Sequence, residues 1–483
     1  MNMSSRNASG RRVVIIGGGL TGTLAAAVLA EHAEQVVVIE RDPLPEGPLP
    51  RRGMPQAQHA HVMWSGGARA VERILPGILD EWMAAGARRI PLPQALVSMT
   101  PQGWFRRWPV EMQFLISCSR DLLDWCIRRR VLELGNVTVR EQSTVSALIG
   151  DAGQVRGVRL ATAGQDAEDL HADLVVDASG RGTRAVNWLA YLGTGPVHEE
   201  EVDSGVAYAT RIYKAPPGTD NYPLVNVQPL ANTGRPGQGT IIAPIEDGRW
   251  LVTLSGTRGG EPTSNPDEFE AFARGALGVR DPIVGELIAH AVPVSDQVLM
   301  SRSTRNRRRF YEKLHTPDGF LALGDAVATY NPVYGHGMSV AALSVVALSE
   351  QLREHGLMAP GLSRRVQRAV VEPTDMAWQM ATGQDVLYPG ATGTPATGAA
   401  RAVQRYIDRL TLTATARPYA TETLLEVMTL SAPATKLFNP TVAWTVLRGP
   451  RRPSLSVPPL SPAEKAAVSA GPLGDRRGPD RVA

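Results

Sequence analysis

Cysteine and long apolar runs are both scarce in this chain of 483 residues. The chain has two cysteines, Cys118 and Cys126. If one helix carries both, about 12 Å separates them, which is beyond the reach of a disulfide. No apolar run reaches the roughly 18 residues that a membrane-spanning helix needs. These absences argue against a disulfide framework and an integral membrane segment, and they predict a cytoplasmic protein.

A surplus of either charge is missing as well. The 50 basic and 47 acidic residues leave a formal charge of +3, which is too small to indicate nucleic acid as a partner. Lysine is rare and occurs only as Lys214, Lys313, Lys436 and Lys465. Hydrophobic residues make up 43% of the chain, and its length allows roughly two or three domains with buried cores.

The N-terminal region follows a strand, helix, strand pattern. Val13–Ile16 is a short apolar run, Leu20–His32 is small and helix-favouring, and Val36–Glu40 is a second apolar run. The start imitates a secretory signal, but its glycines interrupt the apolar run where a signal needs helix. The pattern therefore predicts the βαβ unit that binds one half of a dinucleotide.

The glycines between the first strand and the helix match G-x-G-x-x-G. Gly17 allows the tight turn, Gly19 lets the backbone approach a pyrophosphate, and Gly22 lets the helix pack on the strand. The helix N-terminus adds positive potential. Glu40, at the end of the second strand, is placed to accept hydrogen bonds from a ribose diol.

Farther along the chain, the predicted secondary-structure pattern changes twice. Alternating strands without small-residue helices fill residues 200–300, and the α/β texture resumes at Gly319. We expect an α/β fold with a discontinuous, Rossmann-like domain that binds a dinucleotide. An α+β second domain with an antiparallel sheet and C-terminal helices completes it. The expected ranges are 12–85, 111–195 and 300–360 for the dinucleotide-binding domain, 86–110 and 196–299 for the substrate domain, 361–450 for the helical region, and 1–11 and 451–483 for disordered tails.

A second constellation, GFLALGDAVATYNPVYGHGMS, decides which dinucleotide is expected. A strand ends at Gly324-Asp325, and a glycine-rich turn then precedes a helix that begins near Met338. A nicotinamide cofactor needs nothing of this kind. FAD does, because its ribityl hydroxyls need an acceptor such as Asp325 and its ring needs backbone donors at a helix start.

These motifs, together with DASGRGTR at 177–184, resemble the group A flavoprotein monooxygenases of the p-hydroxybenzoate hydroxylase-like fold. The resemblance implies that the Rossmann-like domain is an FAD-binding domain of the glutathione-reductase and p-hydroxybenzoate hydroxylase type. More narrowly, GMPQAQHAH, DSGVAYATRIY, PIEDGRWLVTLSGTRGGEP and GDAVATYNPVYGHGMS resemble the polyene epoxidases of polyether ionophore pathways, of the lasalocid and monensin type. The resemblance extends to about residue 450. It implies chemistry similar to that of squalene epoxidase.

The resemblance also implies a set of cofactor contacts. Arg120 falls where the family places an arginine at the adenosine half of FAD, and Arg51 and Arg52 stand in the loop that passes beside the flavin, where the sequence does not rank them. The full expected set is Gly17, Gly19, Leu20, Thr21, Gly22, Glu40, Arg41, Arg51, Arg52, Arg120, Val145, Asp325, Pro332, Gly335, Gly337 and Met338.

The same loop holds His59 and His61, which could instead suggest a metal site. A metal needs three or four ligands, and the neighbouring segment offers only Glu72 besides the two histidines. We therefore expect no metal, and we expect both imidazoles to hydrogen-bond the backbone and fix the loop.

The implied reaction takes FAD, O2 as co-substrate, and electrons from NAD(P)H or a separate flavin reductase, since no second G-x-G-x-x-G exists. No catalytic side chain is expected, because the flavin C4a-hydroperoxide carries the chemistry in the resembling family. The implied substrate is an apolar polyene or polyketide, free or bound to a carrier protein. Strands between residues 204 and 255 are expected to give an apolar wall, with Val206, Tyr208, Trp250 and Val252 as candidate contacts that fit a sheet core equally well.

One basic run, Ser301–Lys313, admits more than one interpretation. Its arginines at 302–309 suit a solvated face first, and NADPH capture or docking of an acidic carrier protein second.

Other functions remain open at this point. An aromatic or polyketide hydroxylase, an isoprenoid-type double-bond reductase and a non-catalytic flavin-binding protein share the motifs. A halogenase is disfavoured because that family uses a lysine between flavin and substrate and a W-x-W-x-I-P string, whereas this chain has WFRRWP and no lysine before Lys214. The exact substrate, the number and face of the epoxidations and the oligomeric state do not follow from the sequence.

Overall fold

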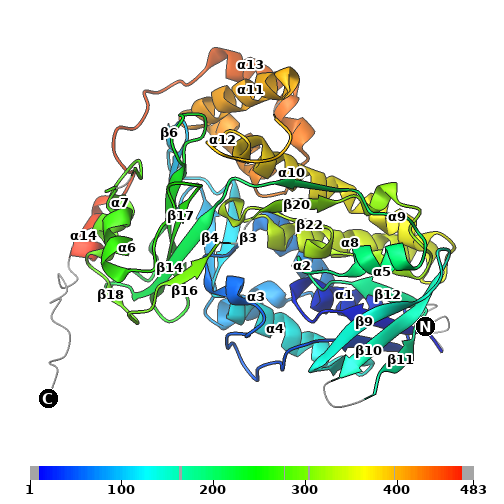
Figure 1. Cartoon of the computed structure of the whole chain (residues 1–483). Helices are drawn as coiled ribbons and strands as arrows, with labels where there is room; N and C mark the ends of the chain where they lie inside the picture. The colour runs from blue at the N-terminus through cyan, green and yellow to red at the C-terminus, as the bar shows by residue number, and fades with distance from the viewer. Residues whose placement is uncertain (1–9, 163–165, 277, 303–304, 396, 470–483) are drawn as a thin grey trace, which may run out of the picture.

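The computed structural model describes residues 10–162, 166–276, 278–302, 305–395 and 397–469. A parallel sheet of five strands lies at the end of the molecule that holds the N-terminus (Figure 1). Its order is β21 (Phe320–Ala322), β12 (Leu174–Asp177), β1 (Arg12–Ile16), β2 (Gln35–Ile39) and β8 (Val137–Arg140). The predicted βαβ unit is therefore present, as β1, α1 (Leu20–Ala30) and β2.

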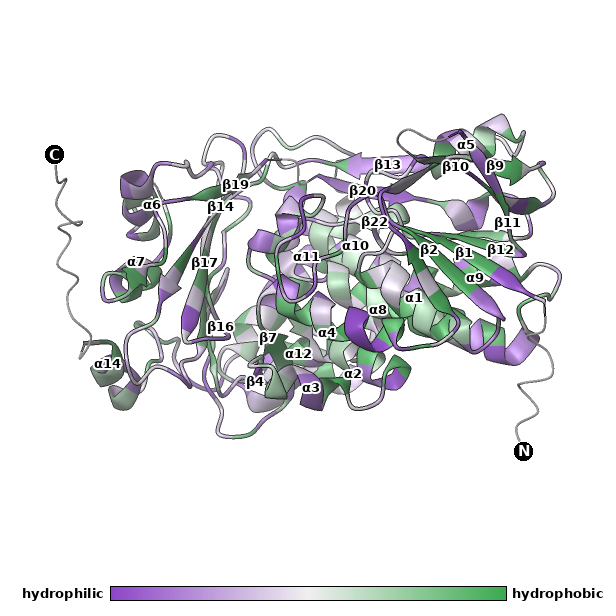
Figure 2. Cartoon of the chain, turned by 90° about the horizontal axis from the view of Figure 1, so that it is seen from below, coloured by the Kyte–Doolittle hydropathy of each residue, from purple (hydrophilic) through white to green (hydrophobic). Residues whose placement is uncertain are grey.

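Both faces of this sheet are covered. Val13 and Ile15 pack against helices on one face, whereas Val14 and Ile16 pack against an antiparallel three-stranded sheet on the other, as the two-residue period of a strand requires. The covering helices are α1, α2 (Ser65–Ile74), α3 (Ile78–Ala84), α4 (Arg120–Leu132) and α8 (Gly337–His355). The covering strands are β9 (Ser143–Gly150), β10 (Val155–Thr162) and β11 (Glu168–His171), with α5 (Ala185–Tyr191) beside them. Figure 2 shows β1 and β2 as largely hydrophobic strands between these layers.

In the sequence, a serine at position 119 with Asp121 two residues later predicts the start of a helix that runs toward Gly135, and α4 begins there. The Ser119 hydroxyl accepts a hydrogen bond from the backbone N–H of Leu122, and Asp121 lies in the first turn. A side-chain acceptor at this position satisfies one of the free N–H groups of a helix start. Cys118 and Cys126 are both buried free thiols.

A second, eight-stranded sheet lies on the other side of the molecule (Figure 1). Its order is β18 (Val292–Pro293), β14 (Ala207–Lys214), β17 (Arg249–Gly256), β16 (Gln238–Ile245), β15 (Leu224–Val227), β5 (Leu96–Thr100) and β6 (Gly103–Trp104), with β19 (Leu299–Ser301) beside β14. Neighbouring strands are antiparallel except β15 and β5, which run parallel.

Helices enclose this sheet from both sides. On the outer face it packs against α6 (Pro266–Ala273) and α7 (Ile283–Ile288). On the inner face lie α11 (Gly398–Ala414), α12 (Pro418–Met428), η5 (Ala434–Phe438) and α13 (Pro440–Arg448). Helices α9 (Leu362–Ala369) and α10 (Val371–Asp385) connect α8 to this group (Figure 1).

Two small sheets join the large ones. One has the order β13 (Glu199–Val202), β20 (Asn306–Arg309) and β22 (Ala328–Thr329). The other has the order β3 (Val62–Trp64), β7 (Gln113–Ser117) and β4 (Arg88–Leu92). Within the described residues, no helix is long and apolar enough to cross a membrane.

The prediction of a disordered C-terminal tail from residue 451 is wrong for the part that the structure describes. Residues 462–469 form α14 (Pro462–Ser469), and the chain leading to it runs beside the eight-stranded sheet (Figure 1). The Arg107 guanidinium binds the Glu464 carboxylate through bonds of 2.6 and 2.7 Å, and Val468 packs in the core beneath α6 and α7. Composition missed this docking because only a few tail residues make it. The expected tails at 1–9 and 470–483 lie outside the described residues.

Candidate functional site

A large cavity runs between the two main sheets. Its volume is about 1740 Å³, above the roughly 300–1,000 Å³ that a drug-sized ligand occupies. It begins at the turn after β1 and ends between the eight-stranded sheet and helices α10, α11 and α12. The cavity is therefore large enough for a dinucleotide and a second ligand.

The first βα turn borders this cavity. Gly17 has a φ of +100°, and a Cβ added to it would lie 2.6 Å from the Ala178 carbonyl oxygen. A Cβ on Gly22 would lie 1.9 Å from the Gly17 carbonyl oxygen, so helix α1 packs tightly on the turn. The space beside Gly19 is open, with nothing within 4 Å, and no side chain caps the helix. This arrangement leaves room and free N–H groups for a pyrophosphate.

Glu40 and Arg51 form a buried ion pair at the edge of the turn. The Glu40 Oε2 atom lies 2.8 Å from the Arg51 guanidinium and accepts a 2.8 Å hydrogen bond from the backbone N–H of Gly18. Arg51 also donates to the Gly18 carbonyl at 2.9 Å. The loop after β2 is thereby tied to the glycine turn. Arg52 is exposed and does not line the cavity, so the geometry favours Arg51 over Arg52.

Asp325 lines the same cavity, although it lies much later in the chain than the glycine turn. It lies in the short turn after β21, where Gly324 has a φ of +61° and would bring a Cβ to 2.3 Å from the Thr21 hydroxyl. The two dinucleotide motifs thus meet in space. Arg120, which pairs with Asp124 at 2.7 Å, lines the same region. Surrounding protein raises the pKa of Asp325 by desolvation, and Arg120 opposes this rise.

The turn before α8 closes this part of the cavity. Asn331 accepts a hydrogen bond from the Val333 N–H at 3.1 Å and so starts η4 (Pro332–Tyr334). Gly335 then takes a φ of +68°, and the space beside Gly337 is open. Helix α8 begins without a side-chain cap, so its first N–H groups stay free toward the cavity.

The two histidines attach the Arg51 loop to the eight-stranded sheet. The His59 Nδ1 atom lies 2.8 Å from the Thr210 hydroxyl on β14, which is a side-chain contact and not the expected backbone contact. The His61 imidazole does bond the backbone, at 2.8 Å from the His59 carbonyl. Burial lowers the pKa of His59 to about 4, and burial with Arg120 lowers that of His61 to about 3. Among the described residues, no group of three or more His, Cys, Asp or Glu is placed to hold a metal.

The cavity brings together most of the residues that the sequence predicts. The predicted contacts that line it are Gly17, Gly19, Leu20, Thr21, Glu40, Arg41, Arg51, Arg120, Val145, Asp325, Pro332, Gly335, Gly337, Met338 and Tyr208. Gly22 lies under the turn and Arg52 lies outside. For all of these residues, contact with a cofactor stays a prediction.

Of the four predicted substrate contacts only Tyr208 lines the cavity, and the strand register explains why Trp250 and Val252 do not. Tyr208 stands opposite Ser255, and Thr210 stands opposite Thr253, so these side chains share the cavity face. Trp250 stands opposite Tyr213, and both side chains lie on the opposite face of the sheet. There Trp250 packs with Val252 in the core beneath α6 and α7. Val206 lines a separate small hollow of about 10 Å³.

The inner face of the sheet is also less apolar than expected. One row across the strands holds Ser98, Asn226, Ile241, Thr253 and Thr210. The Asn226 Oδ1 atom has no hydrogen-bond partner among the described residues. This face of the cavity therefore offers hydroxyl and amide groups.

Much of the apolar lining comes from the C-terminal helices, which the sequence did not assign to the site. The helices contribute Met376 and Met380 on α10, Val403 and Ile407 on α11, Leu424, Leu425 and Met428 on α12, and Leu437 and Phe438 in η5. We call the part of the cavity between the eight-stranded sheet and α10 to α12 the second chamber. Its strand side combines hydroxyl and amide groups with apolar side chains such as Ile241, and its helix side combines the apolar side chains with polar ones such as Gln379 and Gln404.

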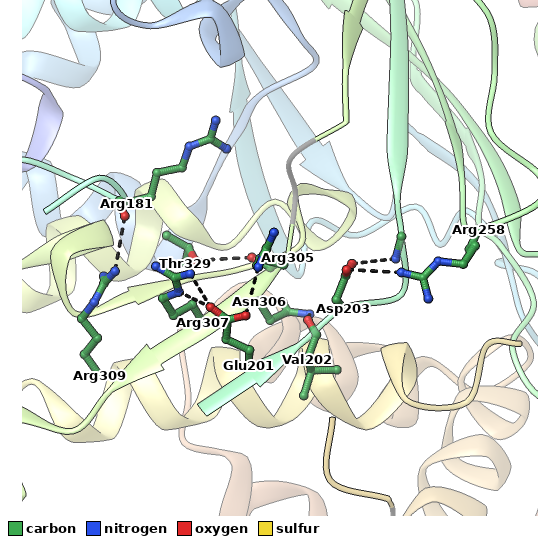
Figure 3. Close-up of polar contacts among 11 residues, drawn as sticks. Arg181, Glu201, Val202, Asp203, Arg258, Arg305, Asn306, Arg307, Arg309 and Thr329 are labelled. Atoms are coloured by element: carbon green, nitrogen blue, oxygen red, sulfur yellow. Dashed lines mark hydrogen bonds and ion pairs between the residues drawn. The ribbon is translucent and has the colours of Figure 1, made fainter. Parts of the chain in front are cut away.

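The basic run lies at the edge of the cavity and is not simply a solvated face. Arg308 and Arg309 are buried; Arg308 binds Asp375 at 2.8 Å and Glu312 at 2.9 Å. Arg305 and Arg307 line the cavity and converge on Glu201, while Arg309 reaches the Arg181 carbonyl (Figure 3). Ion pairs from Arg307 to Glu201 and from Arg309 to Glu199 thus join the neighbouring strands β13 and β20.

Known proteins bear directly on this geometry. The sequence pattern of the FAD dependent oxidoreductase family matches residues 12–191. Protein Rv3254 of Mycobacterium tuberculosis (strain ATCC 25618 / H37Rv) is 31% identical over 401 residues, which cover 79% of this chain and 81% of that protein. The chain belongs to the FAD-dependent oxidoreductases. Kynurenine 3-monooxygenase of Salinispora arenicola (strain CNS-205) is 27% identical and covers 73% and 74% of the two chains.

Solved structures agree on the fold of this FAD-dependent oxidoreductase. PqsL, a probable FAD-dependent monooxygenase from Pseudomonas aeruginosa, superposes with a TM-score of 0.57 at 18% identity over 78% of this chain and 95% of its own. The flavin-dependent brominase Bmp2 gives a TM-score of 0.62 at 17% identity over 90% and 97%. The predicted α/β fold with an FAD-binding domain of the p-hydroxybenzoate hydroxylase type is confirmed.

The residues present fit FAD. The open space beside Gly19 and Gly337 lies at the uncapped starts of α1 and α8, and Glu40 and Asp325 offer acceptors between them. In this arrangement Glu40 would hold the ribose, the α1 start the pyrophosphate, Asp325 the ribityl chain and the α8 start the ring.

Proposed function

We propose that this oxidoreductase is a monooxygenase that epoxidises alkenes of a long polyene or polyketide. The observation that carries the proposal is the continuity of the cavity. The same 1740 Å³ space joins the dinucleotide turn at Gly17 to the second chamber beside Asn226 and Met380. A second ligand in that chamber would lie against the ring end of the cofactor.

The chain's own residues would bind and orient in this reaction. Bound and reduced FAD would supply the activation of O2. The helix wall would bury the apolar length of the substrate and exclude water, and the strand wall would hydrogen-bond its oxygen atoms. His59 and His61 are neutral at pH 7, so neither adds a charge to the chamber. A polyketide, which carries both carbon chain and oxygens, fits the two walls better than a pure hydrocarbon.

The cavity lacks a residue that a halogenase of this fold would need. Halogenases that share this fold rely on a lysine between flavin and substrate, and none of the four lysines of the chain lines the cavity. The similarity to kynurenine 3-monooxygenases favours oxygen insertion over halogenation.

The test is a turnover assay with labelled oxygen. The purified protein is loaded with FAD, reduced with NADPH or with a flavin reductase, and given linear polyenes, free and carrier-bound, under ¹⁸O₂. The proposal expects stereodefined epoxides that carry one labelled atom per alkene. A saturated, unlabelled product would indicate a double-bond reductase, and an aromatic product labelled in a hydroxyl would indicate a hydroxylase.

A further inference from the structure

A buried carboxylate, Asp385, lies beside the turn that precedes α8. It is the last residue of α10 and has no exposed surface. Its oxygens accept hydrogen bonds from Asn306 Nδ2 at 2.7 Å, from Asn331 Nδ2 at 2.9 and 3.0 Å, and from the Tyr334 hydroxyl at 3.0 Å. The Ser204 side chain is a further donor. All of these donors are neutral.

These donors belong to segments that border the cavity. Asn331 and Tyr334 begin and end the turn before Gly335, and both line the cavity. Asn306 begins β20 and accepts from the Asn331 N–H at 2.7 Å. Asp385 therefore holds the turn through side chains that border the cavity, and it does not line the cavity itself.

The same network reaches the substrate wall. The Tyr208 hydroxyl on β14 donates to Asn331 Oδ1 and accepts a 3.0 Å bond from the Val333 N–H. Tyr208 lines the cavity beside Ser255. Asn331 is thus bonded to Asp385 through its nitrogen and to Tyr208 through its oxygen, so one amide couples the α10 end to the strand wall.

A buried carboxylate of this kind is costly to keep. Removal from water raises the pKa of Asp385, and the hydrogen bonds from Asn331, Asn306, Tyr334 and Ser204 counteract that rise. Such groups stabilise little overall, but their donors must face them in one arrangement. Positioning of its hydrogen-bond donors therefore explains the presence of Asp385 better than a gain in the free energy of unfolding does.

We propose that Asp385 is a positioning residue that sets the Asn331–Gly337 turn against the Tyr208 wall, and so fixes the ring end of bound FAD relative to the substrate. The inference rests on the proposed function only in taking FAD as the ligand of the cavity. It predicts effects on bound FAD that need no substrate.

The first experiment replaces the acceptor with an amide of the same shape. Asp385→Asn puts N–H groups against donors from Asn306 and Asn331, so the turn must shift. We expect the Kd for FAD to rise about tenfold, and the visible absorbance and midpoint potential of bound FAD to change. Glu372→Gln removes an exposed carboxylate from the same helix and is the matched control, with no change in any of these quantities.

The second experiment restores the pairing with the roles exchanged. In the double variant D385N/N331D, an amide on α10 donates to a carboxylate on the turn, which still accepts from Tyr208 and Val333. We expect absorbance and potential to return most of the way to the values of the unaltered protein. If D385N does not fold, Tyr334→Phe removes a single donor and should produce a smaller change of the same kind.

The outcomes separate this inference from the proposed function. An unaltered protein that binds no FAD contradicts both. An unaltered protein that binds FAD, with the same potential and Kd in D385N or Y334F, contradicts the role of Asp385 alone. A double variant that folds and remains as far from the unaltered protein as D385N also contradicts it, because loss of packing would then explain the single variant.

Discussion

The Arg51 guanidinium and the Glu40 carboxylate face each other at 2.8 Å, with side chains only 5% and 7% exposed. This pair joins the loop after β2 to the glycine turn after β1. The loop that carries His59 and His61 is thereby tied to the turn that the sequence predicts to bind the dinucleotide.

Arg51→Ala is expected to weaken FAD retention at least about tenfold. The change leaves Glu40 buried without its partner, which typically costs about 3–5 kcal/mol. Arg52→Ala is the matched control, because the neighbouring side chain is exposed and outside the cavity. Equilibrium dialysis of FAD with both variants measures the difference. Equal losses, or a loss only in R52A, would show that the buried pair does not shape the site.

Asn226→Leu and Val252→Ala are expected to affect different properties, because the side chains point to opposite faces of one sheet. Asn226→Leu removes an amide whose Oδ1 atom has no partner among the described residues. It should raise the KM for an oxygenated substrate several-fold, with little change in stability.

Val252→Ala should lower the free energy of unfolding by about 1–3 kcal/mol and leave KM unchanged, since Val252 is fully buried under α6 and α7. Urea unfolding and steady-state kinetics on both variants check the pair. A change in KM for V252A without one for N226L would mean that the strand register is wrong.

The low pKa of His59 predicts a loss of stability in acid. The pKa is about 4 in the folded chain and 6.5 in the reference state, so between these values the unfolded chain binds a proton that the native chain does not. The contribution of His59 to the free energy of unfolding is therefore present in full above pH 6.5. It falls toward pH 4, and at pH 4.5 the loss is about 2–3 kcal/mol.

His59→Gln keeps a polar contact to Thr210 without a titrating ring. Its free energy of unfolding should drop less between pH 7 and 4.5 than that of the unaltered protein, by about 2–3 kcal/mol. Urea unfolding at the two pH values measures this difference. Parallel curves would show that His59 is not shielded from water as the structure places it.

Arg308→Ala is expected to destabilise the protein by about 3–5 kcal/mol, since it leaves Asp375 and Glu312 without their buried partner. Arg302→Ala, in the same basic run but exposed, should stay within about 0.5 kcal/mol. Thermal unfolding compares them. Equal, small effects in both variants would support the interpretation of the run as a solvated face. Docking of a carrier protein is better tested at Arg302 and Arg305, because Arg308 and Arg309 are buried.

The nucleotide half was predictable because its signals are local. The strand before Gly17, the small residues after it and the acidic residue at position 40 are all within one βαβ unit, and each has a physical role there. Asp325 followed from the same logic, as an acceptor at the end of a parallel strand. The Ser119 cap also followed from local chemistry.

The substrate chamber was not predictable in the same way. Which face a strand residue takes depends on register, and a one-residue difference moved Trp250 and Val252 from the cavity to the core. The apolar wall comes from α10 to α12, far along the chain, and Asp385 carries no motif of its own. Only the folded arrangement brings these residues to the turn before α8.

The most direct measurement of the central claim is the mass of the product formed from a linear polyene under ¹⁸O₂. The account predicts one labelled oxygen atom for each alkene consumed, in a product that requires bound FAD and a reductant. A product without label, or oxidation of the reductant that never responds to any alkene despite bound FAD, would contradict it.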